Sequence, residues 1–278
     1  VTYATRRVGA LKQERSSFDS TYRDLSDYIL PRASRWYLED RNRGDRRTNK
    51  ILNDTGTWAC GVAAAGLHGG LTSPSRPWFN LSHPNPALAE QKAARVYFSD
   101  TRDAMFGVFG RSNLYQVLPT FYADLLTFLT GAFLALEDDK DVVRFVHCLV
   151  GTYWLGVSHR GRVDTFCREF QMTSRQLVDQ FGRNSLPVGV LDDLNSNRPE
   201  ERQWNVMHLI EPNRWRRVDS PWARDAAWVS LYWIQGEQTF LQQSGFHEFP
   251  VISGRWSVAG EDTYGTSGPG WQTLADIK

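Results

Sequence analysis

The stretch NDTGTWACGVAAAGLHGGLTSPSRPWFNL, residues 53–81, places a run of small residues before a loop rich in proline and aromatic side chains. Asn53, Asp54 and Thr55 are typical of a helix start, and we expect this helix to continue to Leu71. The segment holds Gly56, Gly61, Gly66, Gly69 and Gly70. Each glycine costs roughly 1 kcal/mol of helix propensity relative to alanine, so we expect the close approach of another backbone to offset that cost.

Helical patterns also flank this stretch. Residues 8–30 carry apolar side chains at helical spacing, which predicts an N-terminal helix. The dipeptide Asn85-Pro86 predicts the start of another helix, because asparagine caps helices and proline suits the first turn. Asn113 predicts the cap of a third helix, which Gly131 is expected to close. The chain up to Gly131 is therefore expected to be mostly helical.

The hydrophobic period changes after residue 131, where helical spacing gives way to short β-type runs. Acidic residues, a glycine and an arginine-rich turn separate four such runs between residues 133 and 171. Runs of this length with these breaks are typical of strands joined by tight turns. The sequence therefore predicts an antiparallel meander over this segment.

A second helical unit and a second β unit follow. Thr173 is expected to cap a helix over residues 174–182, and residues 186–195 suit a further short helix. Strand-like runs return between residues 205 and 256. Turns are expected at Gly236 and Gly245.

The last residues, 260–278, are typical of a glycine-rich loop that enters a helix. That helix has barely begun at Lys278, which indicates that more chain follows in the intact gene product. The order of helices, strands, helix and strands predicts an α+β fold.

The bulk composition is that of an ordinary globular protein. Of the 278 residues, 41% are hydrophobic and 23% are charged, and the chain carries 11 Trp and 10 Tyr. The formal net charge is only +1, whereas a tight nucleic-acid binder usually has a basic excess. Basic patches occur at residues 41–47 and 214–217, where a solvated surface loop is the simpler interpretation.

Signals for covalent cross-links or membrane insertion are few. Cys60, Cys148 and Cys167 form no CxxC motif, which predicts buried reduced thiols and neither a disulfide framework nor a zinc site. No stretch of 18 apolar residues occurs, and residues 1–17 lack the apolar core of a signal peptide.

No catalytic constellation emerges from the titratable and nucleophilic residues. The segment GLHGGLTS, residues 66–73, resembles a phosphate-binding loop but lacks the lysine and the preceding strand. The acidic cluster at residues 137–141 has oxygen ligands for a cation, although a solvated hairpin tip is the simpler interpretation. His147 and Cys148 alternate along a strand, so one of them is expected in the core. No GxSxG or HExxH motif occurs, and we expect no catalytic residue, metal or cofactor.

Two signatures resemble those of bacteriophage head-to-tail connecting proteins, the portal proteins of short-tailed, T7-like phages. The first comprises Asn53, Asp54, Thr55, Gly56, Gly70, Leu71, Thr72, Ser73, Pro74, Arg76, Pro77, Trp78 and Phe79. The second is the loop from Gly260 to Gly265 before the final helix. The N-terminal helix, the helix start at Asn113 and the meander that ends near Thr173 fit the same pattern, so the resemblance covers essentially the whole chain.

The resemblance implies a structural protein rather than an enzyme. Twelve copies would form a ring at one capsid vertex, and double-stranded DNA would pass through its centre during packaging and ejection. The terminase large subunit would dock on the outer end, and a tail adaptor or head-completion protein would replace it. The major capsid and scaffolding proteins would also be partners. The ring would assemble in the host cytoplasm and belong to the virion, with no membrane contact.

The same resemblance implies a division of the chain into portal-like parts. Residues 1–172 would form a wing of helices plus the β meander, and residues 173–202 the first stem helix and its connection. Residues 203–259 would form a small α/β clip, and residues 260–278 the loop and start of the second stem helix. The remainder of that channel-lining helix would be truncated here.

Residue roles follow from this division. The residues expected to face the channel or a neighbouring subunit are Arg175, Gln176, Asp179 and Arg183, unless they form an ordinary polar helix face. The residues expected to contact the motor or adaptor are Arg214, Trp215, Arg216 and Arg217. For the stretch at residues 70–79, a corner within one chain and a subunit contact both stay open, and we expect no contact with DNA.

Two other classes of function stay open. A metal-dependent hydrolase or nuclease would use the acidic cluster at residues 137–141, and Asp138→Ala or Asp139→Ala would abolish its activity. An aromatic-rich binding module, for example for carbohydrate, would be a monomer with exposed tryptophans. Neither accounts for the two ordered signatures or for the unfinished final helix.

Overall fold

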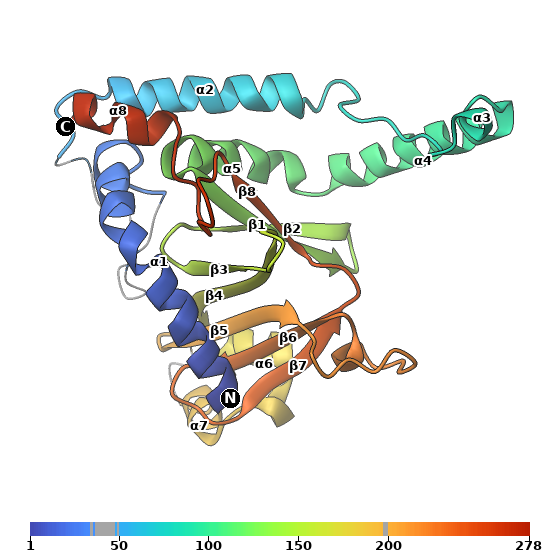
Figure 1. Cartoon of the computed structure of the whole chain (residues 1–278). Coiled ribbons are helices and arrows are strands. Elements are labelled where there is room, and N and C mark those ends of the chain that lie inside the picture. The colour runs from blue at the N-terminus through green and yellow to red at the C-terminus, as the bar shows by residue number, and fades with distance from the viewer. Residues whose placement is uncertain (34–35, 37–47, 49, 197–199) are drawn as a thin grey trace.

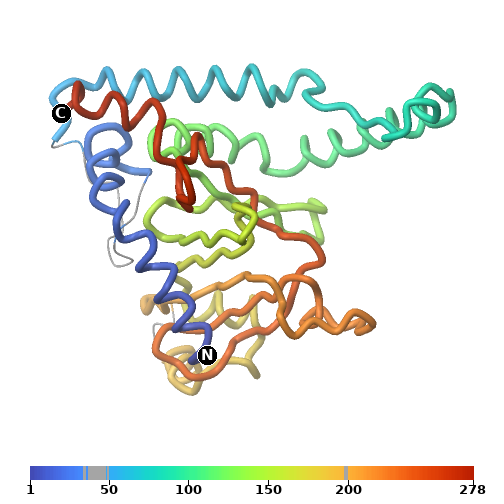
Figure 2. The backbone as a smooth tube through the Cα atoms, in the orientation of Figure 1, coloured from blue at the N-terminus to red at the C-terminus, as the bar shows by residue number. Residues whose placement is uncertain are grey.

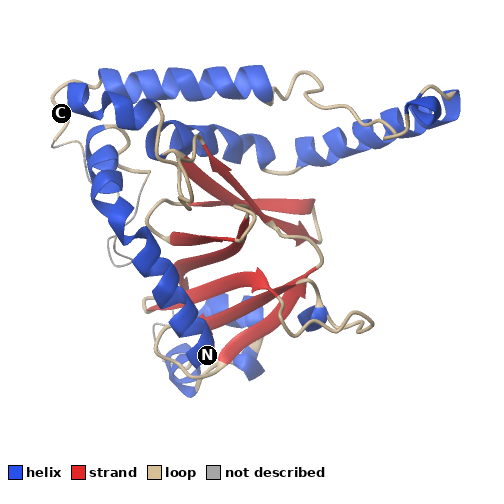
Figure 3. Ribbon diagram, viewed as in Figure 1, coloured by secondary structure: helices blue, strands red, loops and turns tan. Residues whose placement is uncertain are grey.

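The computed structural model describes residues 1–33, 36, 48, 50–196 and 200–278, so the basic patch at residues 41–47 lies outside the described residues. A layer of helices lies over two antiparallel sheets, and two short helices cover the far side of the larger sheet (Figures 1 and 3). The α+β class expected from the sequence is confirmed.

Helices α1 and α2 both form where the sequence predicts them. Helix α1, Thr2–Tyr28, begins earlier than its apolar spacing indicates and runs down one side of both sheets (Figure 2). Helix α2, Thr55–Leu71, has the predicted ends. It packs on helix α5, Leu114–Phe128, through its two buried residues, Cys60 and Ala64.

The helix expected after Asn85 is two helices, so the prediction of one continuous helix is wrong. Asn85 caps helix α3, Pro86–Ala89, by accepting a 3.0 Å hydrogen bond from the Ala87 amide. Helix α4, Lys92–Arg111, begins only after Gln91, whose extended backbone (φ −67°, ψ 132°) interrupts the helical hydrogen bonds.

The sequence predicts that Gly131 closes helix α5, and this prediction is wrong. Leu129 takes the left-handed conformation at the helix end (φ 60°), and Gly131 lies in strand β1, Thr130–Asp138. A Cβ atom on Gly131 would approach the Phe121 ring at 3.0 Å. The glycine therefore serves the close packing of helix α5 on strand β1 rather than the cap.

The smaller sheet joins segments that are distant in the sequence. Its order is β2-β1-β8, with β2 at Val142–Cys148 and β8 at Val251–Arg255. Both pairings are antiparallel, and Leu134 of β1 lies opposite Val146 on one side and Val251 on the other.

The larger sheet shows that the expected meander is not a single sheet. Its order is β3-β4-β5-β6-β7, so the first hairpin of the meander belongs to one sheet and the second to another. The strands are β3 Tyr153–Val157, β4 Val163–Thr173, β5 Gln203–Pro212, β6 Trp228–Ile234 and β7 Phe240–Phe246. The turn at Gly151 (φ 98°) carries the chain between the sheets.

Gly245 lies in strand β7 opposite Val229, not in a turn, which corrects the prediction for this glycine. A Cβ atom there would meet the carbonyl oxygens of Ala223 and Trp228 at 2.4 and 2.6 Å. Gly236, by contrast, occupies a turn with a φ of 92°, as predicted.

The remaining helices follow the sequence closely. Helix α6, Ser174–Phe181, begins with a capping box in which Thr173 and Gln176 bond to each other's backbone amides. Helix α7, Val188–Leu194, and helix α8, Pro269–Ile277, form as expected. Two short 3₁₀ helices, η1 at Arg183–Ser185 and η2 at Ala223–Asp225, complete the described elements.

Candidate functional site

The loop after helix α2 forms a corner within the chain. Trp78 and Phe79 pack with Phe106 and Phe109 of helix α4, and the Trp78 and Phe109 rings stack at 6.2 Å between centroids. The Trp78 indole N–H donates to the Tyr115 hydroxyl at 3.3 Å. These contacts hold the end of α2 against the helices that follow. Of the two roles considered for this stretch, they correspond to the corner within one chain. Pro74, Arg76 and Pro77 stay exposed.

The start of helix α2 supplies the other half of the first signature. The Asn53 side-chain oxygen accepts hydrogen bonds from the Thr55 amide at 2.9 Å and from its hydroxyl at 2.5 Å. Gly56 faces helix α8, where an added Cβ atom would lie 3.0 Å from the Ile277 side chain. Among the glycines of α2, Gly56 alone meets such a neighbour in the described chain, and the others face open space.

A groove of about 540 Å³ opens where helices α2, α5 and α8 meet. Gly56, Ala59 and Ala63 form one wall, and Leu126 and Ile277 contribute to the others. Most of the lining is therefore small or apolar. We refer to this feature as the α2–α8 groove.

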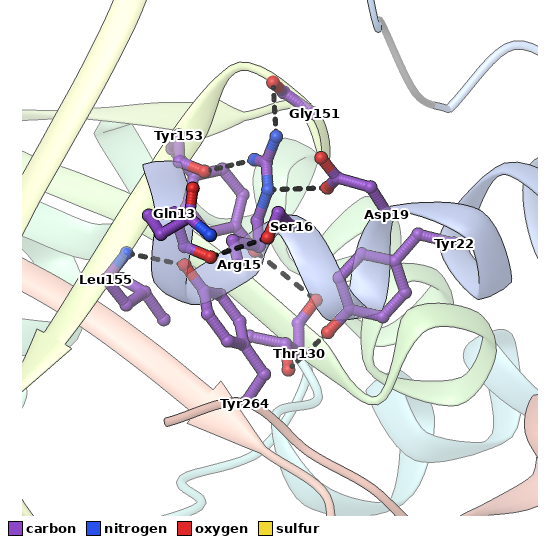
Figure 4. A network of polar contacts seen from close by, with 10 residues as sticks. All are labelled: Gln13, Arg15, Ser16, Asp19, Tyr22, Thr130, Gly151, Tyr153, Leu155 and Tyr264. Carbon is purple, nitrogen blue, oxygen red and sulfur yellow. Dashed lines mark hydrogen bonds and ion pairs between the residues drawn. The ribbon is translucent and has the colours of Figure 1, made fainter. Parts of the chain in front are cut away.

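A buried polar network holds helix α1 against both sheets (Figure 4). The Arg15 side chain is almost wholly buried, and its guanidinium donates to the carbonyl oxygens of Tyr153 at 2.5 Å and Gly151 at 3.2 Å. The same group pairs with Asp19 one turn along α1, at 2.9 Å. Arg15 therefore satisfies the backbone at the turn where the chain passes from one sheet to the other.

The second signature completes this network. The Tyr264 hydroxyl accepts a 2.9 Å hydrogen bond from the Leu155 amide (Figure 4). The Gly265 amide donates to the Thr130 hydroxyl at 2.9 Å. Tyr22 donates to the same Thr130 hydroxyl at 3.4 Å, and burial raises the pKa of Tyr22 to about 12. The loop before helix α8 is therefore fixed to both sheets by neutral hydroxyls and amides, and Tyr22 of α1 bonds to the same Thr130 hydroxyl.

Asp124 and His147 form a second buried polar contact. The Asp124 carboxylate lies on the core face of helix α5, and its Oδ2 atom is 2.7 Å from Nε2 of His147 in strand β2. Its Oδ1 atom has no hydrogen-bond partner among the described residues. Burial raises the pKa of Asp124, and the His147 hydrogen bond opposes that rise. Of the pair His147 and Cys148, Cys148 is the core residue.

Replacing Asp124 with asparagine is expected to change how stability depends on pH. Because the folded pKa of Asp124 is raised, the unfolded chain loses this proton first as the pH rises above about 3.8. The stability linked to this carboxyl is fully present below pH 3.8 and is lost as the pH rises through the raised pKa. The difference in unfolding free energy between wild type and Asp124→Asn, from urea titrations, should fall across that window. A difference that rises with pH would contradict this assignment.

The polar residues of helix α6 lie on one exposed face. Arg175, Gln176 and Asp179 are exposed on α6, and Arg183 is exposed just beyond it. Arg175 pairs with Glu200 at 3.1 Å. The opposite face buries Leu177 against the larger sheet. All four predicted residues are thus exposed, three on helix α6 and Arg183 just beyond it.

The loop at residues 213–226 projects from the body between strands β5 and β6 (Figure 1). Asn213 braces it by donating to the carbonyl oxygens of Arg224 and Ala226, both at 3.0 Å, while its own oxygen accepts from the Trp215 amide. Trp215 and Trp222 are 69% and 66% exposed. The exposed arginines of the loop are Arg214, Arg216, Arg217 and Arg224. The loop therefore presents aromatic and cationic side chains on a braced backbone.

The acidic cluster at residues 137–141 forms a hairpin turn. The Asp138 carboxylate accepts hydrogen bonds from the amides of Lys140 at 2.9 Å and Asp141 at 3.1 Å, which lowers the Asp138 pKa. Within the described ranges, no three His, Cys, Asp or Glu side chains are grouped so as to hold a metal ion. The search of the same residues for a helix of sufficient length and apolarity to cross a membrane finds none.

The comparison with known families decides where the chain belongs. The family model described as "Bacteriophage head to tail connecting protein" matches residues 2–278. The chain belongs to this family. The expectation drawn from the two signatures is thereby confirmed.

Two curated phage proteins are similar to this chain. The portal protein of Salmonella phage epsilon15 is 41% identical over 275 residues, and the probable portal protein of Bordetella phage BPP-1 is 38% identical over 275 residues. Each match covers 98% of this chain and 49% of the relative. The chain thus spans about half the length of the curated relatives it matches.

Sequence reasoning missed the buried polar residues that this family member uses to join its layers. Arg15 and Asp124 were not singled out, although each stands in an otherwise apolar helical face. That departure from the apolar pattern is the signal that finds them, because a buried charge needs a partner. Thr130 carries no comparable signal, since its role depends on loops far away in the chain.

Proposed function

We propose that this chain is part of a structural, non-enzymatic portal that connects head and tail in a phage virion. Twelve copies form a ring at one capsid vertex, and double-stranded DNA passes through its channel during packaging and ejection. The terminase large subunit and then a tail adaptor dock on the ring, which also contacts the major capsid and scaffolding proteins. The observation that carries the proposal is the family match over residues 2–278.

Within this proposal, residues 1–172 act as the wing, 173–202 as the first stem segment, 203–259 as the clip and 260–278 as the entry to the second stem helix. Strand β4 of the proposed wing pairs directly with strand β5 of the proposed clip. The two parts would therefore move as one rigid unit rather than as hinged domains.

The exposed face of helix α6 is assigned to the channel or to a subunit boundary. It carries Arg175 and Asp179, with Arg183 just beyond its end, so its charge is mixed. DNA sliding is favoured when few phosphates are neutralised, because each such contact adds about 0.9 to the salt dependence of binding. The formal net charge of +1 also supports weak, non-specific contact with DNA.

The test of the ring is the mass and shape of the complete gene product. Light scattering is expected to give twelve times the chain mass, and negative-stain electron microscopy is expected to show rings with a central hole wide enough for a duplex. A protein that stays monomeric, even with its capsid and scaffolding proteins present, would overturn the proposal.

The loop at residues 213–226 is assigned to the docking of terminase or tail adaptor. Replacing Trp222 with alanine is expected to weaken that docking by about 30-fold or more, because exposed tryptophans flanked by arginines are typical binding hot spots worth 2 kcal/mol or more. Surface plasmon resonance on assembled rings measures the affinity.

The matched control is Trp58→Ala, which removes a tryptophan of similar exposure (68%) from helix α2. This variant should bind the adaptor and terminase as the wild type does. Equal losses of affinity in the two variants would point to a general effect on the ring. An unchanged affinity in Trp222→Ala would show that the loop is not part of the docking surface.

A further inference from the structure

Two complementary features lie at opposite ends of the helical layer. Residues 82–102, which we refer to as the arm, project from the body where the chain turns back from α2 into α4 (Figures 1 and 2). The α2–α8 groove lies at the other end of the same layer, beside the start of α2 and helix α8 (Figure 1). One end therefore protrudes, and the other is recessed.

The arm exposes apolar side chains that the described chain covers only in part. Helix α4 has no buried residue, although it runs for about 30 Å at 1.5 Å per residue. Val96 is 50% exposed and Tyr97 is 65% exposed, and Leu88 of helix α3 is 39% exposed. Grouped apolar side chains on a projecting element are typical of a protein–protein contact.

The α2–α8 groove offers a matching apolar surface. Its wall on α2 consists of small residues, and the stripe Gly56, Ala59 and Ala63 continues outward to Gly66 and Gly70 along the helix. Among the described residues, no atom outside the helix lies within 4 Å of a Cβ position at Gly66 or Gly70. Small residues of this kind allow another helix to approach closely. The sequence predicts such an approach, but no segment of the described chain makes it at Gly66 or Gly70.

Charges on the two features are complementary. Lys92 and Arg95 are exposed on the arm, and neither forms an ion pair with another described residue. Asp276 lines the groove, and Asp54 lies between two lining residues; both are exposed and likewise have no ion pair in the described ranges. The arm holds Lys92, Arg95 and Arg102 against Glu90 and Asp100, so its formal net charge is +1.

We propose that the arm of one copy docks in the α2–α8 groove of the next copy around the ring. The inference rests on the proposed ring and adds to it the surfaces that hold neighbours together. A protrusion and a recess at opposite ends of one chain give a head-to-tail contact, and such heterologous contacts form a ring when the rotation between neighbours closes. The arm cannot reach the groove of its own chain, because helices α2, α4 and α5 separate the two.

Cysteine cross-linking of the complete gene product tests the contact. Leu88→Cys on the arm is combined with Ala63→Cys in the groove, and assembled rings are oxidised and run on a denaturing, non-reducing gel. The expected result is a ladder from dimer upward to the closed ring, because each chain carries one arm and one groove. The variants are made in a Cys60→Ser background, because Cys60 lines the groove. Each single variant should then remain at the mass of one chain, since Cys148 and Cys167 are buried.

The matched control pairs Leu88→Cys with Gln243→Cys, an exposed position on strand β7 of the larger sheet. This pair should give no ladder. The arm contact would be overturned if the wild type formed rings but Leu88→Cys/Ala63→Cys gave only single-chain products. The proposed ring would then still stand. An absence of rings in the wild type would instead overturn the proposed function.

Charge reversal gives a second test that does not depend on cysteine chemistry. Arg95→Glu and Asp276→Arg are each expected to reduce the yield of rings at least tenfold, while the double variant Arg95→Glu/Asp276→Arg recovers most of it. Arg111→Glu, at the base of helix α4, should assemble as the wild type does. Wild-type ring yields from both single reversals, with circular dichroism unchanged, would overturn the proposal.

Discussion

Replacing Arg15 with methionine is expected to lower the free energy of unfolding by about 3–5 kcal/mol, because it removes one partner of a buried, charged network. Methionine keeps an unbranched apolar stem beside Trp154, whose ring lies 4.9 Å from the Arg15 guanidinium. The carbonyl oxygens of Gly151 and Tyr153 would lose their charged donor. Urea unfolding followed by tryptophan fluorescence measures the loss.

Arg6→Met on the same helix provides the control. Arg6 is exposed on α1, so its replacement should change the unfolding free energy by less than about 0.5 kcal/mol. If Arg15→Met were as stable as Arg6→Met, the buried network would not be what holds helix α1 to the turn between the sheets.

Replacing Gly265 with alanine is expected to destabilise the chain by about 3 kcal/mol or more, because the new methyl group has no room. Its Cβ atom would lie 2.2 Å from the Leu129 carbonyl oxygen, and that oxygen also accepts a 2.9 Å hydrogen bond from the Trp256 amide. The loop would have to move away, which would break the Gly265 bond to Thr130. Thermal or urea unfolding of the variant checks the size of this effect.

Gly9→Ala gives the opposite expectation from the same substitution. Gly9 lies within helix α1, and no atom of the described chain outside this helix is within 4 Å of its Cβ position. Alanine there should stabilise the chain by roughly 0.5–1 kcal/mol, since it raises helix propensity. Equal effects of the two substitutions would show that the close approach at Gly265 is not the cause.

Local features of the fold were predictable from the sequence, because their causes are local. The ends of helix α2, the cap at Thr173 and the turn at Gly236 follow from residues within one turn of each feature. Gly131 and Gly245 misled the prediction, because glycine also occurs where another element approaches closely. The close contact of Gly131 with Phe121, and of Gly245 with Ala223, shows that these glycines serve packing and not a turn.

Strand partners were not predictable, because a period of two says which face is buried and not which strand lies alongside. The turn at Gly151 is similar to a hairpin turn in the sequence, yet it leads from one sheet into another. The first signature was recognised as a family feature, but its pairing of Trp78 with helix α4 required the fold. The same holds for Arg15, whose acceptors are backbone carbonyls that no side-chain motif marks.

The pairing of β1 with β8 has a consequence for how the chain leaves the ribosome. Strand β1 ends at Asp138, but the partner on its second edge begins only at Val251. At a synthesis rate of 5–20 residues per second, the second edge of β1 stays unpaired for roughly 6 to 23 s before β8 is made. A strand with unpaired amides and carbonyls is a template for pairing with other chains. Nascent chains on neighbouring ribosomes are therefore most exposed to mispairing at β1, and a chaperone that binds there would act before the small sheet closes.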